Sequence, residues 1–304
     1  MLLKDNIPLK YIFGKIKNEI IFISIYTVAI AVIYDNFHVT RISIPLSVPM
    51  ILGTVISLLL GFRSSQAYDR WWEARTIWGA IVNDSRTLSR QISNMVKDNY
   101  GPAELDDFKS NWIRRQMAWC YSLSGHLRER DGTRGIDVLM KRKEVQFTSN
   151  YDNIPASILL LHARDLKYAL EQGWINEYQQ VEIDKTLSRL CDNMGACERI
   201  KNTVFPATYS LYIHIALNFF IMLLPFGLIE YFGFMEVPLV VAIAALFLLI
   251  EKMAINLQDP FENEPTDTPM DAICKTIEKD LRQVIQDDEE VPVKVRDKTR
   301  FYVM

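Results

Sequence analysis

Two interleaved stripes of residues, each with a spacing of four, single out one apolar segment of this chain. On a helix, residues four apart lie on the same face. Small side chains in such a stripe let helices approach closely within lipid, whereas larger neutral side chains ringed around an axis gate a pore by excluding water. The small stripe comes first and the larger one follows one position along: Gly53, Ser57 and Gly61, then Thr54, Leu58 and Phe62.

The two stripes are open to two interpretations. In the first, both only pack against neighbouring helices, as is common in membrane proteins. In the second, the small stripe packs against a neighbour while the larger stripe faces a pore. A handful of helices cannot enclose a water-filled path alone, so a pore would need several copies of the chain around a symmetry axis.

Patterns of enzyme chemistry are missing from the sequence. It contains no GxGxxG, Walker loop, HExxH or GxSxG motif, the patterns that mark phosphate-binding loops, zinc proteases and serine hydrolases. Its 4 cysteines form no CxxC pair, so no zinc site is expected. We therefore expect a protein that is not an enzyme, with no catalytic residues, no cofactor and no bound metal.

A group of acids after Gln258 is the nearest approach to a cation site. Calcium prefers about six to eight oxygen ligands around one point. The candidate acids are interrupted by Pro260 and Pro265, which prevent any standard calcium loop, so capping and solvation are the favoured roles. The acids are Asp259, Glu262, Glu264 and Asp267.

One further polar pair stands inside an apolar segment. His214 and Asn218 are one helical turn apart and share a face. Polar groups in lipid are functional candidates, but an interhelical hydrogen bond is the commoner explanation, and we favour this structural role.

Four runs without Asp, Glu, Lys or Arg define the elements that must position these residues: 20–34, 42–62, 203–229 and 237–250. A membrane-spanning helix needs about 20 apolar residues, with about 17 at the short end. The two shorter runs reach that length with weakly polar neighbours. We therefore predict an all-α integral membrane protein with four transmembrane helices, embedded in the lipid bilayer.

Basic residues predict the orientation, because lysines and arginines near span ends stay on the cytoplasmic side. They flank the inner ends of the spans, for example Lys15, Lys17, Arg63 and Lys252. We expect a multi-pass protein of the cell (inner) membrane with both termini cytoplasmic. Its segments are 1–62 (N-terminal segment and transmembrane helices 1 and 2), 63–202 (cytoplasmic helical region), 203–250 (transmembrane helices 3 and 4) and 251–304 (cytoplasmic C-terminal helix and tail).

Helical patterns continue through the cytoplasmic region. No proline interrupts residues 50–100, so the second span is expected to run on as one long helix or a closely joined pair. Further helices are expected over about 106–130, 154–171 and 177–193. A last helix is expected to start at a Thr268 cap. Its packing face is Ile273, Ile277, Leu281 and Ile285.

Several motifs in these elements resemble those of the bestrophin family in its bacterial form. The longest is GFRSSQAYDRWWEAR at 61–75, closed by Trp78 and Gly79. Three short motifs follow in order: CERI at 197–200, LPF at 224–226 and DPF at 259–261. The resemblance covers nearly the whole chain except about the last dozen residues.

This resemblance implies an all-helical homopentameric ion channel. The second helices of five subunits would line a hydrophobic neck at Thr54, Leu58 and Phe62, and a lower cytoplasmic constriction would fall at Tyr178. Eukaryotic members carry a calcium-binding cluster of consecutive acids after the last span, which this chain lacks. Eukaryotic members pass anions, whereas bacterial relatives favour cations, so chloride and a cation both remain open as the small inorganic ion conducted.

Two classes of function are therefore carried forward. The first is a bestrophin-like ion channel, which the double stripe and the family resemblance favour. The alternative is a membrane-anchored signalling or scaffold protein, which would show a long polar linker between its membrane and soluble parts. Nucleic acid is excluded as a partner, since the formal net charge is −3 and binding would need a basic stripe. A pentamer would also bury the aromatic side chains of Trp71, Trp72 and Trp78 between subunits.

Overall fold

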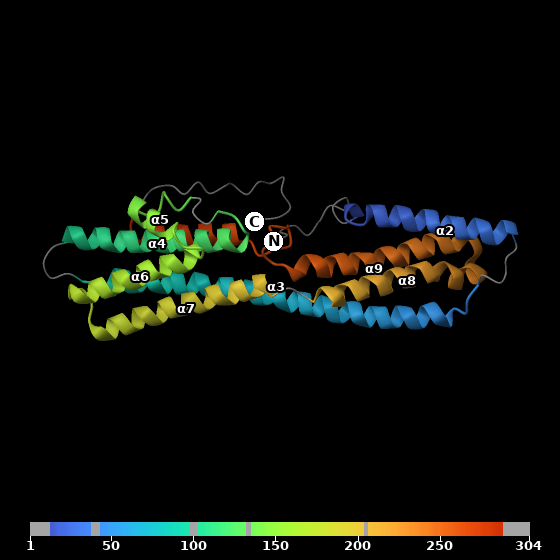
Figure 1. Ribbon diagram of the computed structural model, residues 1–304, viewed down its shortest axis with the longest axis horizontal. Helices are drawn as coiled ribbons and strands as arrows, with labels where there is room; N and C mark the ends of the chain where they lie inside the picture. Colours follow the sequence, from blue (N-terminus) through green and yellow to red (C-terminus); the bar gives the residue numbers. More distant parts are fainter. Residues whose placement is uncertain (1–12, 38–42, 98–101, 132–134, 204–205, 288–304) are drawn as a thin grey trace. The chain divides into compact units, whose positions relative to one another are not determined.

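A computed structural model describes residues 13–37, 43–97, 102–131, 135–203 and 206–287 of the chain (Figure 1). Within these residues the regular structure is entirely helical, which confirms the predicted all-α class. Packing divides the chain into two compact units. We call residues 13–71 and 206–259 the membrane unit, and residues 72–203 and 260–287 the bundle unit.

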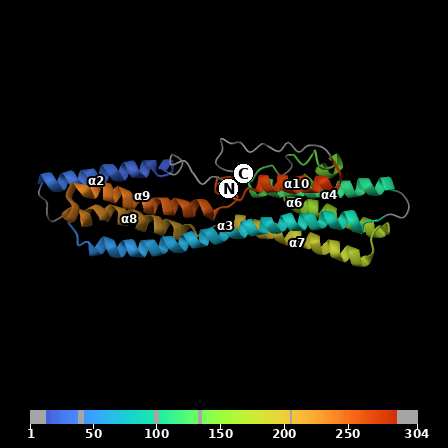
Figure 2. The same cartoon turned by 180° about the vertical axis from the view of Figure 1, so that it is seen from behind.

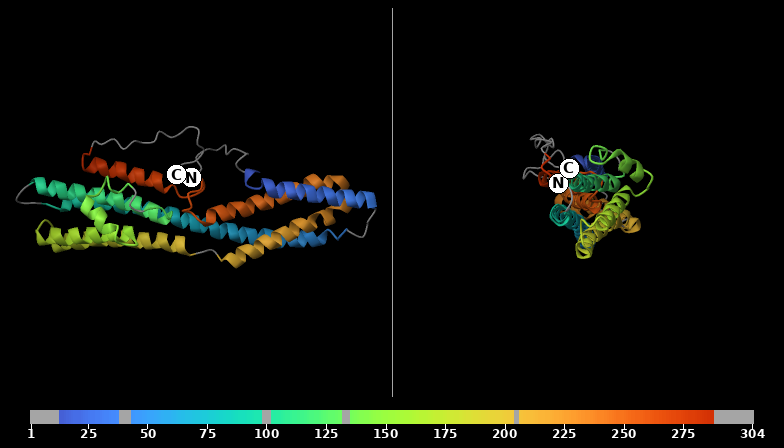
Figure 3. Two further views of the ribbon diagram at one scale, coloured as in Figure 1. Left: turned by 45° about the horizontal axis from the view of Figure 1, so that its top comes forward. Right: turned by 90° about the vertical axis from the view of Figure 1, so that its left-hand side faces the viewer.

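The membrane unit consists of four helical segments: α2 (Lys17–Phe37), the first part of α3 (Ser47–Met95), α8 (Ala207–Phe232) and α9 (Glu236–Gln258). The 3₁₀ turn Gly233–Met235 joins α8 to α9, and the two helices lie side by side (Figures 1 and 2). Gly233 has a φ of +51° in this turn, a value that glycine adopts without a steric penalty. Helix α2 packs against α9 (Figure 3).

Among the residues that the structure describes, three helical stretches are long and apolar enough to cross a membrane: 17–36, 47–95 and 208–258. The third stretch contains both α8 and α9, each of which exceeds the minimum of about 17 residues. The expected membrane protein is therefore supported, while the count of four crossings stays a prediction.

The core of the membrane unit is apolar, and so is much of its surface. Leu217 and Val240 are fully buried, and Ile56 and Leu60 of α3 pack in the same cluster. Other large apolar side chains of α2, α3, α8 and α9 are exposed, among them Phe22, Ile51, Tyr212 and Leu246. Lipid accepts such a surface, because the hydrocarbon layer is as apolar as the side chains.

The bundle unit is built from the second part of α3 and five further helices: α4 (Pro102–Leu127), α5 (Arg142–Thr148), α6 (Ile154–Glu171), α7 (Glu177–Asn202) and α10 (Met270–Val284). Helices α6 and α7 pack together, and α10 packs along α4 (Figures 1 and 2). The expected face of α10 is confirmed, since Ile273, Ile277 and Leu281 are buried in the core and Ile285 packs against it.

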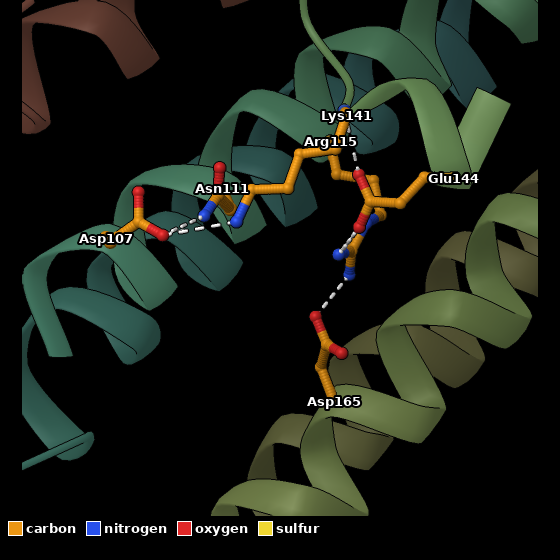
Figure 4. A network of polar contacts seen from close by, with 6 residues as sticks. All are labelled: Asp107, Asn111, Arg115, Lys141, Glu144 and Asp165. Atoms are coloured by element: carbon orange, nitrogen blue, oxygen red, sulfur yellow. Dashed lines mark hydrogen bonds and ion pairs between the residues drawn. The ribbon is translucent and has the colours of Figure 1, made fainter. Parts of the chain in front are cut away.

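A polar network ties α4 to α5 and α6 inside the bundle unit (Figure 4). The guanidinium of Arg115 on α4 donates to Glu144 of α5 and, over 2.6 Å, to Asp165 of α6. Nearby, Asp107 accepts from Asn111 and from Lys141. Arg115 is almost wholly buried, so its two carboxylate partners offset the cost of removing its charge from water.

The long helix α3 confirms the expectation that the second span continues without a break, because it extends over 49 residues. Other boundaries differ from those expected. Helix α7 runs on to Asn202, and α5 is a short helix that was not predicted. The Thr268 cap is wrong: α10 begins at Met270 without a side-chain cap, and the Thr268 hydroxyl has no hydrogen-bond partner within the described part of the chain.

The expected burial of tryptophans between subunits needs correction for one of them. Trp78 is fully buried within its own chain, in the same core as Trp112 and Trp119. Trp72 remains 54% exposed, so of these residues it is Trp72 that presents a large apolar surface to an outside partner.

The structure does not test the predicted segment borders or the predicted orientation of the termini. The expected borders at 62/63, 202/203 and 250/251 describe the membrane surface, whereas the two units are defined by internal packing. Residues 1–12 and 288–304 lie outside the described residues. The orientation of the termini therefore stays a prediction.

Candidate functional site

The larger stripe of α3 lies on an exposed face of its helix. Leu58 is 61% exposed and Phe62 is 56% exposed, and Thr54 one turn earlier is exposed as well. The opposite face of the same turns carries Ile56 and Leu60, which are buried in the membrane unit. Helix α3 is therefore anchored by one side and presents the stripe outward on the other.

The hydroxyl of Thr54 is bound within its own helix. Its Oγ1 donates to the carbonyl oxygen of Met50 over 2.9 Å. Back-bonding of this kind uses the hydroxyl proton locally. The exposed stripe is therefore neutral and presents no free hydrogen-bond donor, which is the character of a surface that sheds water.

The small stripe is packed at only one of its positions within a single chain. A Cβ atom added to Gly53 would lie 3.1 Å from the ring of Phe220 on α8, whereas one added to Gly61 would meet no atom of another described segment within 4 Å. Ser57 is exposed and donates to the carbonyl of Gly53 over 2.7 Å. A packing role for Ser57 and Gly61 therefore requires a neighbour from outside the chain, and it stays a proposal.

Tyr178 belongs to the bundle unit, in the first turn of α7. Asn176 caps this helix, with its side chain accepting from the amide of Gln179 over 2.9 Å. Gly173, with a φ of +70°, ends the preceding helix and sets up the turn. Tyr178 is 85% exposed. Its ring is therefore held on a rigid, capped helix end and projects away from the core of the unit.

A cluster of ionisable side chains in the membrane unit was missed by the sequence reasoning. Nδ1 of His214 on α8 lies 3.0 Å from Oε1 of Glu251 on α9. The guanidinium of Arg63 on α3 lies 3.7 Å from the same oxygen. The expected interhelical bond of His214 is thus present, but its partner is Glu251. Asn218 instead donates to the backbone carbonyl of His214.

The sequence did contain a signal for this cluster. Arg63 ends the charge-free run 42–62, and Glu251 ends the run 237–250. Both spans are predicted to run from the outer side to the cytoplasmic side, so Arg63 and Glu251 lie at the cytoplasmic ends of their spans. Opposite charges at the same end of two adjacent spans are good candidates for an ion pair.

Three of the four acids after α9 have different local partners. Asp259 lies 3.8 Å from Arg70, and Glu262 lies 2.7 Å from Lys201. Asp267 is buried and accepts the amide of Glu264 over 3.0 Å. Among the described residues no three His, Cys, Asp or Glu side chains gather where they could hold a metal ion.

Burial and nearby charge shift the pKa of several groups in the bundle unit. Burial raises the pKa of Asp267 to about 6, although the amide of Glu264 and the charge of Arg128 act in the opposite direction. Burial also raises the pKa of the Cys120 and Cys197 thiols to about 12. Thiols of this kind remain protonated and are poor nucleophiles. Burial, aided by Arg115, holds the pKa of His162 well below its usual range.

The chain is similar in sequence to proteins named as voltage-dependent anion channel-forming proteins. A voltage-dependent anion channel-forming protein of Nostoc sp. is 32% identical over 278 residues, which cover 89% of this chain and 87% of the relative. The voltage-dependent anion channel-forming protein YneE of Escherichia coli strain K12 is 28% identical over 93% of this chain.

A solved structure has a closely similar fold. The crystal structure of a bacterial bestrophin homolog from Klebsiella pneumoniae superposes with a TM-score of 0.83 at 29% sequence identity, covering 89% of this chain and 98% of that one. Residues 9–283 match the family described as "Bacterial/Fungal Bestrophin protein". The chain therefore belongs to the bacterial and fungal bestrophin family, as its motifs after the second span predicted.

Proposed function

We propose that this protein is a channel that conducts small monovalent anions across the inner membrane. The observation that carries the proposal is the exposed neutral stripe of α3, at Thr54, Leu58 and Phe62, on a helix whose opposite face is buried. Such a stripe is suited to a constriction that opens and closes by wetting. The names of the similar proteins from Nostoc and Escherichia coli support anions as the ions conducted.

The pore in this proposal is built by five copies of the chain around one axis. The larger stripe of each copy lines the neck, and Gly53, Ser57 and Gly61 pack against the adjacent copy. The exposed ring of Trp72 supports assembly, because large aromatic side chains are enriched at interfaces. Tyr178 lines the lower opening, and both termini lie in the cytoplasm.

Calcium is not required in the proposed mechanism. The acids after α9 are separated by prolines and engage different partners, namely Arg70, Lys201 and a backbone amide. Currents are therefore expected to persist in the presence of a strong chelator. Channels silenced by the chelator and restored by micromolar calcium, the range typical of sensor sites, would contradict this part of the proposal.

The decisive experiment measures reversal potentials of the purified protein in planar bilayers under a salt gradient. A potential close to that of chloride supports the proposal, and one close to that of the cation reverses the assigned selectivity. An absence of current would favour the scaffold function, although the unbroken helix α3 leaves no polar linker between the spans and the bundle. Native mass spectrometry in detergent tests the pentamer, which a monomer or dimer would overturn.

A further inference from the structure

A buried ion pair lies directly behind the proposed neck. Arg63 follows Phe62 in the sequence, yet Phe62 is exposed and the Arg63 side chain is only 3% exposed. Its partner Glu251 is 1% exposed. The Arg63–Glu251 ion pair therefore links the helical turn that carries Phe62 to α9.

Two partners share one oxygen of Glu251. Oε1 receives both the Nδ1 contact of His214 at 3.0 Å and the guanidinium contact of Arg63 at 3.7 Å. The shorter contact lies within hydrogen-bond range and the longer one lies beyond it. Oε2 of Glu251 has no hydrogen-bond partner among the described residues. The hold of Glu251 on Arg63 is thus in competition with His214.

The histidine is the member of the cluster whose side chain is exposed on the surface of the chain. His214 is 51% exposed, and histidine is the side chain that proteins most often use as a pH switch. A neutral ring contributes a hydrogen bond, whereas a protonated ring adds a positive charge next to Glu251 and binds that carboxylate more tightly. Proton binding therefore strengthens the contact of His214 with Glu251 relative to the contact of Arg63 with Glu251.

Other charges around the cluster come from each neighbouring helix. On α2, Glu19 interacts electrostatically with His214. Its carboxylate also lies 3.2 Å from Nζ of Lys252 on α9. On α8, Tyr209 interacts with Arg63. Glu19 and Lys252 form an ion pair with each other. Among the groups named around Glu251, His214 is the histidine, the residue type suited to a pH switch.

We propose that Arg63 and Glu251 are positioning residues for the neck, and that protonation of His214 weakens their contact and narrows the constriction. With His214 neutral, Glu251 holds Arg63 and keeps the turn that bears Phe62 drawn toward α9. With His214 charged, Glu251 is drawn to the imidazolium, and the Phe62 turn relaxes outward toward the other copies. This inference rests on the proposed channel function.

The test compares bilayer currents of the reconstituted full chain between about pH 8 and about pH 5.5, with the same pH on both sides. The parent is expected to lose current about five-fold or more on acidification, in the range of ordinary coupling between sites. His214→Gln should remove most of this loss. The matched control is His126→Gln, since His126 lies 3.6 Å from Glu198 in the bundle unit, and it should behave like the parent.

A second variant separates positioning from folding. Arg63→Met combined with Glu251→Gln removes both charges and leaves neither one buried without a partner. This variant should assemble, and its current should stay near the low level that the parent shows at about pH 5.5, with no further change with pH. Acid inhibition that survives in His214→Gln, or that vanishes equally in His126→Gln, would overturn the inference. A parent with current at every pH but no pH dependence would also overturn it, whereas a parent without current at any pH would refute the proposed function itself.

Discussion

The two ends of helix α3 treat large apolar side chains in opposite ways. In the membrane unit, Leu58 and Phe62 are more than half exposed, whereas in the bundle unit Trp78, Ile81 and Ile92 are completely buried. The bundle unit closes its core with segments of the same chain. The membrane unit leaves its apolar stripe for something outside the chain to cover. A difference of this kind along one helix distinguishes residues that stabilise the fold from residues that are available for assembly and conduction.

The largest loss of stability is expected when Trp78 is replaced. Trp78→Ala should destabilise the protein by about 3–5 kcal/mol, because it leaves a cavity in a packed core. Leu58→Ala, on the same helix, should cost less than about 1 kcal/mol of chain stability, since its side chain is already exposed. Thermal unfolding in detergent measures both. Equal losses would show that the two ends of α3 do not differ as described.

A pair of alanines in the stripe tests what covers the exposed end. Leu58→Ala with Phe62→Ala should raise single-channel conductance several-fold, because a wider and less apolar constriction wets more readily. The matched control is Leu211→Ala with Phe219→Ala on α8, two residues with similar exposure in the same unit. The control should leave conductance unchanged. If the two pairs act alike, the stripe faces lipid.

The small stripe separates packing within a chain from packing between chains. Gly53→Leu should cost about 1–3 kcal/mol through overpacking, because even a Cβ atom would lie 3.1 Å from Phe220. A Cβ atom at Gly61 would meet no described atom of another segment within 4 Å, so we expect the single chain to tolerate Gly61→Leu while the yield of pentamer falls. Size-exclusion chromatography with native mass spectrometry distinguishes the two. A normal pentamer from Gly61→Leu would remove that residue from the interface.

Asp267 is a buried carboxyl group in the bundle unit. Its folded-state pKa of about 6 lies above the ordinary value of 3.8, so its contribution to stability is full below the unfolded pKa and is lost as the pH rises through about 6. Asp267→Asn should therefore raise stability by about 1–3 kcal/mol above pH 7 and give no gain near pH 4. The unfolding midpoint as a function of pH measures this effect, with the exposed Glu262→Gln as a control that should stay flat. A gain that is independent of pH would contradict the burial argument.

Tyr178 is expected to give the smallest effect. Tyr178→Ala should change the permeability ratio of ions of different size more than it changes gating, because ring edges carry partial positive charge and would face a passing ion. Mixed-ion reversal potentials measure the ratio. The matched control is Tyr151→Phe, another exposed aromatic position of the bundle unit. Parental ratios in Tyr178→Ala would place the lower constriction elsewhere.

The sequence predicted most of the helices because their signals are local. Charge-free runs marked the apolar helices, and the spacing of Ile273, Ile277 and Leu281 identified the buried face of α10. The exposure of Leu58 and Phe62 is consistent with the expected outward face, yet their place in a pore depends on other copies of the chain. Periodicity identifies a face, but it does not identify what covers that face.

The features that sequence reasoning missed depend on contacts between distant segments. Glu251 and His214 are 37 positions apart, and Arg63 is farther still from both. The start of α10 was misplaced for a related reason. Thr268 has a good capping signature, but its backbone amide is held by the carbonyl of Pro260 and its hydroxyl is buried. Tertiary contacts override a local preference worth about 1 kcal/mol.

The late position of α10 in the chain has a consequence for synthesis. This helix covers α4 through the contacts of Glu278 with Tyr121 and of Cys274 with the carbonyl of Cys120, yet α8 and α9 are made between them. Chains emerge from the ribosome with the N-terminus first. The face of α4 that α10 covers in the folded protein therefore stays exposed until both apolar helices have left the ribosome. Completion of the bundle is thereby timed to follow insertion, and a nascent chain that stalls before α10 exposes an apolar surface that chaperones and proteases recognise.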